Sequence, residues 1–317
     1  MDVQFASDLH LELYDNSSFI ARNPFKAKGQ VLVLAGDSLP LREFDVYKRH
    51  RFFDWCSANF RETLLIPGNH EYYHGDLADY PDPSWERELR PNVRMYENRS
   101  LVADDVEFIL STLWTHIPDK EWPNLRDGMN DFHLISHGGR PLSADDYNRL
   151  HKRDLAFIKE AIAKSTARYK VVVTHHVPSK LCVAKEFQGS SLESGFSVDL
   201  TDFIESSGVN LWVYGHSHRR VDKMIGRTYV ASNPLGYVIN KEDKKSFSGA
   251  RYVSVGRFME YQSLLDKMSP AEREKAGRES LINLIDGEDA LGKENLSSPL
   301  TNEEGFYSSL EPFLNID

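Results

Sequence analysis

Short apolar runs recur along this chain of 317 residues, and polar residues follow each run directly. The runs are rich in β-branched residues, which is typical of strands that are buried on both faces of a sheet. We expect strands at residues 3–6, 31–35, 64–66, 108–113, 171–173, 211–214 and 229–231. Helix-like stretches separate several of them, at residues 43–60, 145–164 and 199–206. The repeated order of strand, helix and strand predicts a largely α/β sheet architecture.

The polar residues at the ends of these strands form a set of histidines, aspartates and one asparagine. Open α/β sheets bind ligands at the carboxyl ends of their strands, so we expect these side chains to converge on one site. Asp8 and His10 are two residues apart, a spacing at which extended side chains point the same way, and His216 and His218 repeat it. The candidate site residues are Asp8, His10, Asp37, Asn69, His70, His175, His216 and His218.

This residue set has the chemistry of a metal centre. Carboxylate, amide and imidazole ligands together suit Mn, Fe, Zn, Co or Ni better than an ion that binds only oxygen. Cysteine is absent from the set, which argues against a structural zinc site. Gly36 and Gly215 directly precede Asp37 and His216, where they allow tight turns of the backbone.

Taken singly, each of these residues has an ordinary structural explanation. His10 or His218 alone would be interpreted as a surface or core histidine, and Asp37 and Asn69, each after a glycine, as turn residues. Their joint occurrence at the ends of successive predicted strands favours the metal site.

Five segments, taken in order, resemble the sequence motifs of calcineurin-like metallophosphoesterases, and they span residues 8 to 218. They are Asp8-Leu9-His10, Gly36-Asp37, Gly68-Asn69-His70-Glu71, Thr174-His175-His176 and Gly215-His216-Ser217-His218. Other segments are similar to an uncharacterised bacterial branch of that family: Leu113-Trp114-Thr115, Met129-Asn130-Asp131, residues 174–179 and residues 233–237. The chain departs from the family pattern after Asp37, where Ser38-Leu39-Pro40 stands in place of further acidic or polar support.

The resemblance implies a two-sheet β-sandwich flanked by helices, a four-layer α/β/β/α fold. It also implies two metal ions whose identity stays open among Mn, Fe, Zn, Co and Ni. Asp37 would bridge both ions, and His70 would be the catalytic residue beside the phosphate. The first ion would be bound by Asp8, His10 and His218, and the second by Asn69, His175 and His216.

The implied activity is that of a phosphohydrolase with two metal ions. Two ions about 3.5–4 Å apart can clamp the attacking and leaving oxygens, and a hydroxide between them attacks the phosphorus. We expect a phosphodiesterase acting on a small phosphodiester, such as a cyclic nucleotide or a glycerophosphodiester. The alternatives are a phosphomonoesterase, a phosphoprotein phosphatase with the same site, a non-catalytic scaffold on this fold, and a metal-storage or sensing module.

Several further residues have open roles. Alignment of the strand selects His175 as the metal ligand. His176 would then either support the ligands from behind or face the phosphate. Asn130 and His116 are candidate substrate contacts because they follow a strand end. Glu71 and the two tyrosines after it are assigned to solvent or packing.

Composition narrows the remaining possibilities. With 40% hydrophobic residues, the chain can bury a large core. Its character changes past about Gly256, so we expect a catalytic domain over residues 1–255 and a helical or irregular extension over 256–317. The net charge of −10 disfavours nucleic-acid partners, although a local basic patch stays possible. No apolar stretch reaches the length of a membrane span and no signal peptide is visible, so we expect a cytoplasmic protein that acts on small phosphate esters. Oligomeric state is not legible, and residues 81–95 and the extension are candidates for a lid.

Overall fold

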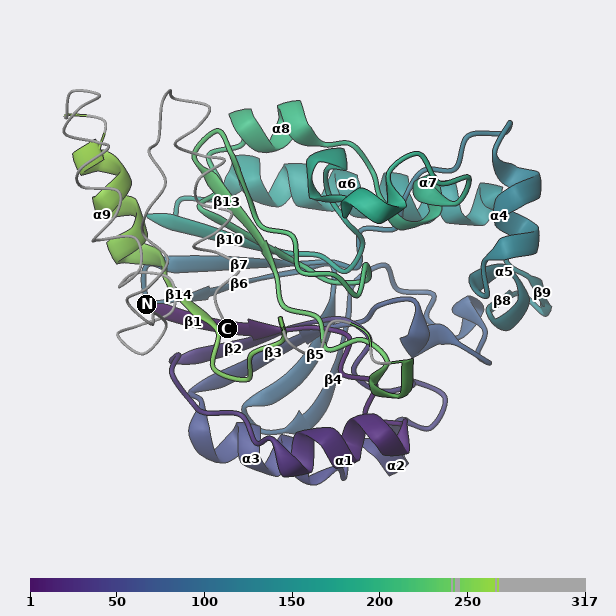
Figure 1. Cartoon of the computed structure of the whole chain (residues 1–317), viewed down its shortest axis with the longest axis horizontal. Helices are drawn as coiled ribbons and strands as arrows, with labels where there is room; N and C mark the ends of the chain where they lie inside the picture. Colours follow the sequence, from purple (N-terminus) through teal and green to yellow (C-terminus); the bar gives the residue numbers. More distant parts are fainter. Residues whose placement is uncertain (241, 243–245, 266, 268–317) are drawn as a thin grey trace.

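Two mixed β-sheets of six strands each form the centre of the computed structural model, which describes residues 1–240, 242, 246–265 and 267 (Figure 1). In the first sheet the order is β14-β1-β2-β3-β5-β4, with antiparallel strands at the two edges and four parallel strands between them. Its strands are β1 (Asp2–Ala6), β2 (Val31–Ala35), β3 (Glu62–Ile66), β4 (Trp85–Arg90), β5 (Val93–Glu97) and β14 (Tyr252–Ser254).

The second sheet repeats this arrangement in the order β12-β13-β11-β10-β7-β6. Its four middle strands are parallel, and β12 and β6 are antiparallel edges. Its strands are β6 (Arg99–Ala103), β7 (Val106–Leu110), β10 (Tyr169–Val173), β11 (Leu211–Tyr214), β12 (Lys223–Ile225) and β13 (Thr228–Ser232). A separate two-stranded sheet joins β8 (Ser136–His137) to β9 (Arg140–Pro141).

The two large sheets pack face to face over an apolar core. Alternate residues of β2 show how this works, because successive side chains of a strand point to opposite faces. Val31 and Val33 lie in the core between the sheets with Val171 and Val213. Leu32 and Leu34 point the other way and lie in the core under the helices. The strands are therefore buried on both faces, as the apolar runs predict.

Helices cover the outer face of each sheet. The helices α1 (Tyr14–Arg22), α2 (Phe44–Tyr47) and α3 (Arg51–Asn59) cover the first sheet, and Phe53 of α3 lies in the same apolar cluster as Leu34. The helices α6 (Ala144–Lys164) and α8 (Thr201–Ser206) cover the second sheet, where Ile158 and Ile204 pack with Trp212. Figure 1 shows the resulting four layers, so the predicted α/β/β/α fold is confirmed.

Shorter elements occupy the loops near the carboxyl ends of the parallel strands and the end of the described chain. The short helices are α4 (Trp122–Gly128), α5 (Asp131–Leu134) and α7 (Glu193–Phe196), and α9 (Val255–Leu265) follows the last strand. The 3-10 turns are η1 (His70–Tyr72), η2 (Leu77–Asp79), η3 (Lys180–Cys182), η4 (Lys185–Phe187) and η5 (Val238–Asn240).

The structure differs from the sequence expectations at three places. The helix expected over residues 43–60 is two helices, because the chain leaves helical geometry at His50, whose side chain accepts the Phe52 N–H and caps α3. The strand expected over residues 108–113 ends at Leu110. The lid considered for residues 81–95 is wrong, because these residues supply β4 and much of β5, which pair at the edge of the first sheet.

The division into residues 1–255 and an extension stays a prediction. The first ten residues of that extension belong to α9, and most of the rest, residue 266 and residues 268–317, lie outside the described residues. Among the described residues, no helix combines the length and the apolar character that crossing a membrane requires.

Candidate metal centre

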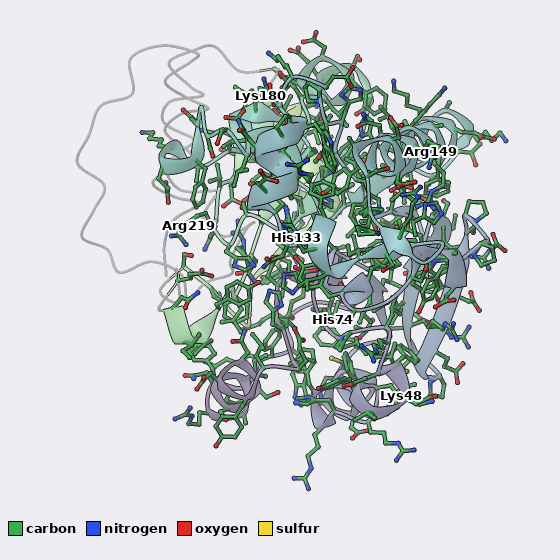
Figure 2. The ribbon with its side chains drawn as sticks, turned by 90° about the vertical axis from the view of Figure 1, so that its right-hand side faces the viewer. Lys48, His74, His133, Arg149, Lys180 and Arg219 are labelled. Atoms are coloured by element: carbon green, nitrogen blue, oxygen red, sulfur yellow. The ribbon has the colours of Figure 1, made fainter. Side chains whose placement is uncertain are left out.

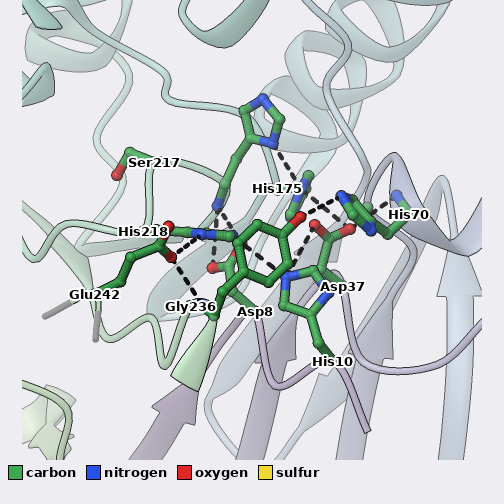
Figure 3. A network of polar contacts seen from close by, with 12 residues as sticks. Asp8, His10, Asp37, His70, His175, Ser217, His218, Gly236 and Glu242 are labelled. Atoms are coloured by element: carbon green, nitrogen blue, oxygen red, sulfur yellow. Dashed lines mark hydrogen bonds and ion pairs between the residues drawn. The ribbon is translucent and has the colours of Figure 1, made fainter. Parts of the chain in front are cut away.

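Loops from both large sheets meet at one point. Asp8, Asp37 and Asn69 follow β1, β2 and β3 of the first sheet, and His175 and His216 follow β10 and β11 of the second. Three groups of side chains there present possible ligand atoms within 4.8 Å of one another, and Figure 3 shows most of them from close by. The groups are Asp8, His10, Asp37 and His218; Asp37, His175 and His216; and His10, Glu12 and His70.

Asp37 belongs to the first two groups and stands between them. Its Oδ1 lies 3.4 Å from Nε2 of His175, and its Oδ2 lies 3.8 Å from Nε2 of His10. The two oxygens of one buried carboxylate therefore face different histidines. This is the geometry that a ligand shared by two metal ions requires.

Three histidines are oriented by an acceptor at the nitrogen that faces away from the centre. Nδ1 of His175 lies 2.9 Å from the carbonyl oxygen of Ala35, which can only accept, so this nitrogen carries the proton. Nδ1 of His218 lies 2.7 Å from Glu242, and Nδ1 of His10 lies 3.3 Å from a carboxylate oxygen of residue 12. Anchoring of this kind leaves Nε2 available as a ligand atom and is typical of metal-binding histidines.

Asn69 is oriented in a comparable way. Its Nδ2 donates to Asp131 at 2.8 Å, and Tyr147 donates to the same buried carboxyl group at 3.1 Å. The amide oxygen of Asn69 therefore faces the site, 3.0 Å from Nε2 of His175. The neutral asparagine can act as an oxygen ligand without adding negative charge.

The backbone of the ligand loops is strained in a consistent way. Nine non-glycine residues have positive φ angles in the described part of the chain, and five of them are candidate ligands. Such conformations are uncommon for residues other than glycine and concentrate at functional sites. The five are Asp8 (54°), His10 (43°), Asp37 (54°), His216 (70°) and His218 (49°).

Two glycines leave room for the ligands. A Cβ atom at Gly36, where φ is 88°, would overlap the ring of His175. A Cβ atom at Gly68 would overlap both Asp37 and the same ring. Glycine is required at these positions because the backbone passes directly against the ligand side chains.

Glu71 organises the loops that carry Asp37 and Asn69, and the assignment of Glu71 to solvent or packing missed this contact. Its buried carboxylate accepts the backbone N–H groups of Gly68 at 2.6 Å, Asp37 at 2.9 Å, Ser38 at 2.6 Å and a fourth from residue 39 at 3.1 Å. Glu71 thus supports the turn at residues 38–40, where the chain departs from the family pattern. The signal for this role in the sequence was the presence of an acidic residue, Glu71, inside the motif that contains Asn69.

His70 and Tyr237 form a second group next to the ligands. Nε2 of His70 and the hydroxyl of Tyr237 share a hydrogen bond of 3.0 Å, and the backbone N–H of His70 donates to Oδ1 of Asp37. The Tyr237 ring also lies against His10 and His218, with centroid distances of 4.8 and 4.7 Å. Sequence reasoning placed no function on this tyrosine.

Buried charges of opposite sign determine the electrostatics. Burial opposes the charged form of Asp37, yet His175 and His70 hold the pKa of this carboxyl well below its ordinary value. Burial likewise opposes the imidazolium form, but Asp37 raises the pKa of His175 to about 9, and hydrogen bonds to Asp8 and Glu242 raise the pKa of His218 to about 10. For His70, burial is the largest effect and lowers the pKa to about 3. Without metal, the positive charges of His175 and His218 balance these carboxylates, and divalent cations bound at the site would take over this role.

A cavity of about 460 Å³ opens beside these groups. Asp37, Asn69, His70, His216 and His218 line its floor, and Tyr237 and Glu242 also line it. Figure 2 shows the side of the molecule on which Arg219, another lining residue, is labelled. The cavity is large enough for a substrate of which the phosphate is only one part.

The three residues named as substrate contacts lie in different surroundings. Asn130 lines the cavity. His176 is fully buried behind His216, where its Nε2 lies 3.1 Å from the hydroxyl of Tyr147. His116 is exposed beside His151, with their ring centroids 6.0 Å apart, and it is not among the residues that line the cavity.

The comparisons with known proteins agree with this geometry. The family model for calcineurin-like phosphoesterases matches residues 1–220. The chain is 24% identical over 281 residues to the uncharacterized protein L509 of Acanthamoeba polyphaga mimivirus, covering 81% of this chain and 98% of the viral protein.

Two solved structures are also similar. The phosphopantetheinyl hydrolase of Mycobacterium tuberculosis has a TM-score of 0.59 and 16% identity, covering 80% of this chain and 95% of that one, and it shares the fold. A dimetal phosphatase from Danio rerio has a TM-score of 0.42 and 14% identity, with coverage of 80% and 94%.

Proposed function

Because the chain belongs to the calcineurin-like phosphoesterases, and is therefore a hydrolase of phosphoric esters, we propose that it is a two-metal phosphodiesterase that acts on a small phosphodiester. The observation that carries this proposal is the position of Asp37, whose two carboxylate oxygens face different histidines. One carboxylate that belongs to two groups of ligands is suited to hold two ions at a short distance from each other.

The proposed ligands follow the two groups of side chains that contain Asp37. Asp37 is shared, and the residues present fit the ions because the anchored histidines direct Nε2 towards the centre. When bound, the two ions supply an activated water and stabilise the charge on the phosphate. The first ion would be held by Asp8, His10 and His218, and the second by Asn69, His175 and His216.

His70 is the proposed catalytic residue outside the ligand set. It lines the cavity, and its backbone is fixed by the hydrogen bond to Asp37. Because burial lowers the pKa of His70 to about 3, the ring is neutral, and its N–H group can donate a hydrogen bond to an ester oxygen as that oxygen gains negative charge. Tyr237 holds the ring through the bond at Nε2.

The cavity is large enough for the organic groups of a diester. A diester has a second organic group attached to phosphorus, and the space beyond the ligands can accommodate it. A phosphomonoesterase or phosphoprotein phosphatase with the same residues is the alternative, followed by a scaffold that binds metal without turnover. The substrate contact proposed here is Asn130, which lines the cavity.

We also propose manganese as the physiological metal and the cytoplasm as the location. The ligand set of imidazole, carboxylate and amide groups suits manganese among other transition metals. Cys56 and Cys182 are both buried free thiols, as expected for a protein in a reducing compartment.

Hydrolysis assays on metal-stripped protein resupplied with Mn²⁺ test the proposal. The substrates are bis(p-nitrophenyl) phosphate and the matched monoester, and the variant is Asp37→Asn. We expect metal-dependent diester hydrolysis that is abolished in Asp37→Asn, because the amide weakens the bridge to both ions. Rates near wild type for this variant in metal-replete buffer would contradict the assignment. Two bound ions without hydrolysis of either ester would favour the scaffold.

A further inference from the structure

One side of the cavity is apolar, although its floor carries the candidate metal ligands. The segment that follows β10, residues 177–197, builds most of this wall, and the residue before Asn130 adds a side chain to it. The residues of the apolar wall are Met129, Val183, Ala184, Phe187, Leu192 and Phe196.

Two large aromatic side chains of the wall are exposed to the cavity. Phe187 is 41% exposed and Phe196 is 37% exposed. Large apolar side chains left exposed within a concave site mark binding surfaces, because contact with water gives them no stabilisation.

The apolar wall begins directly at the metal ligands. The ring of Phe196 stacks on the ring of His216, with centroids 4.8 Å apart and planes inclined by 28°. A group bonded to a phosphate at the centre would therefore reach the wall without a long linker.

Backbone hydrogen bonds fix the wall in place. Val177 N–H donates to the carbonyl of Phe196 at 3.1 Å, and Val198 N–H donates back to Val177 at 3.0 Å, which pins the two ends of the segment together. Gly195 packs so closely on Met129 that a Cβ atom would overlap the methionine sulfur.

Charged side chains around the cavity already have partners within the protein. Arg219 pairs with Glu186 at 2.8 Å and lies over the ring of Phe187 at 5.7 Å. Glu193 accepts the backbone N–H of Gly189 at 2.7 Å, and Glu242 pairs with a histidine of the centre. A charged organic group of the substrate would compete with these contacts, whereas an uncharged one would not.

We propose that the apolar wall is the binding subsite for an uncharged organic group of the substrate, about the size of one aromatic ring, and the proposal rests on the phosphate-binding metal centre described above. The phosphate would be bound at the floor, and the ring would pack against Phe187 and Phe196. Asn130 offers one amide at the rim for a polar atom of that group.

Binding of three phosphonates to the full-length, Mn²⁺-loaded chain tests this subsite by calorimetry, without a need for turnover. Phenylphosphonate carries the ring, methylphosphonate lacks it, and 2-aminoethylphosphonate carries a positive charge. Because burying a ring removes a large apolar area from water, we expect phenylphosphonate to bind roughly tenfold more tightly than methylphosphonate, or better. The aminoethyl compound should bind no more tightly than the methyl compound.

Variants locate the effect in the wall. Phe187→Ala and Phe196→Leu should reduce the ratio of phenylphosphonate to methylphosphonate affinity several-fold; the ratio is the measured quantity because Phe196 stacks on His216 and its replacement can alter the binding of both compounds. Leu181→Ala is the matched control, since Leu181 is 51% exposed in the same segment and does not line the cavity.

The outcomes separate the subsite from the metal centre. Equal binding of the phenyl and methyl compounds, or a preference that survives both Phe variants, would overturn the apolar subsite alone. Failure of all three phosphonates to bind the metal-loaded chain would overturn the phosphate site on which the proposal rests. Phosphonate binding without ester hydrolysis would contradict the proposed catalysis and leave the subsite supported.

Discussion

The side chains of His70 and Tyr237 share a hydrogen bond, and either side chain can be replaced without removing a proposed metal ligand. We expect His70→Ala to lower kcat about 100-fold or more, the usual size when a hydrogen-bond donor to developing negative charge is lost, with metal content unchanged. Tyr237→Phe keeps the ring against His10 and His218 and removes only the hydroxyl, so its effect on kcat should be smaller. Steady-state kinetics and metal analysis of both variants check this. A loss of metal equal to the loss of rate in His70→Ala would show that His70 is a ligand.

Glu71 is a residue whose replacement should alter both stability and metal binding. Each carboxylate oxygen accepts two backbone N–H groups, and Glu71→Gln replaces one oxygen with an NH₂ group that cannot accept. Two buried donors then lose their partner, so the free energy of unfolding should fall by about 2–4 kcal/mol. Urea unfolding measures this change, and Mn²⁺ titration should show weaker binding. The control is Glu62→Gln, at a partly exposed position, and a loss of similar size there would contradict the explanation.

Some residues of the candidate site could be predicted from the sequence, whereas the roles of others depend on contacts that only the folded chain makes. The eight candidate site residues are recognisable because their types and order along the chain follow the strand ends. Tyr237 lies in a segment that is similar to the bacterial branch, but its role has no signal in the sequence, since it meets His70 across 167 positions, and Glu242 has no signal of either kind. Glu71 lies inside a recognised motif, but its four backbone partners become visible only when the loops after β2 and β3 are placed together.

At the scale of elements, Arg153 links α6 to the junction of the two sheets. Its guanidinium lies 2.9 Å from Glu97 at the end of β5 and 2.8 Å from Asp154, and both carboxylates are fully buried. Glu97 also accepts the hydroxyl of Thr112, which follows β7. We expect Arg153→Met to lower the free energy of unfolding by about 3 kcal/mol, because it leaves buried carboxylates without their cation.

The matched control for this prediction is Arg149→Met on the same helix. Arg149 is 62% exposed, and its partner Asp146 keeps the contacts with Arg140 and Ser143. The free energy of unfolding should therefore change by less than about 0.5 kcal/mol. Equal losses in the two variants, measured by urea unfolding, would show that burial of the carboxylates does not determine the effect.

Element prediction succeeded where burial dominates the sequence pattern. The seven apolar runs are strands because both of their faces lie in cores. The helix α6 was predicted because its helical pattern continues over many residues. By contrast, only one residue of β4 is buried, and the segment is a strand through its pairing with β5, a contact that leaves no apolar run in the sequence. The short helices of the loops are likewise determined by their surroundings.

For the whole molecule, metal ions should act as a clamp between the two sheets. Asp8, Asp37 and Asn69 come from the first sheet and His175 and His216 from the second, so binding favours only the assembled fold. With free Mn²⁺ at 100 times Kd, each site stabilises the fold by about 2.7 kcal/mol, which corresponds to several degrees in Tm.

Calorimetry with and without a chelator checks this prediction. Tm should fall by several degrees when metal is removed from the wild type, and by clearly less in Asp37→Asn, which binds metal weakly from the start. A Tm that does not respond to the chelator would contradict the clamp.

The order of strands in the first sheet has a consequence for how the protein is made. β1 pairs with β2 on one side and with β14 on the other, so the strand translated first waits for one translated about 250 residues later. Throughout that interval one edge of β1 has backbone groups without their final partner, and such edges readily pair with other chains. The proposed ligand set would likewise stay incomplete until His218 has left the ribosome. The nascent chain therefore depends on protection of this edge, by its own helices or by a chaperone, before it can become an enzyme.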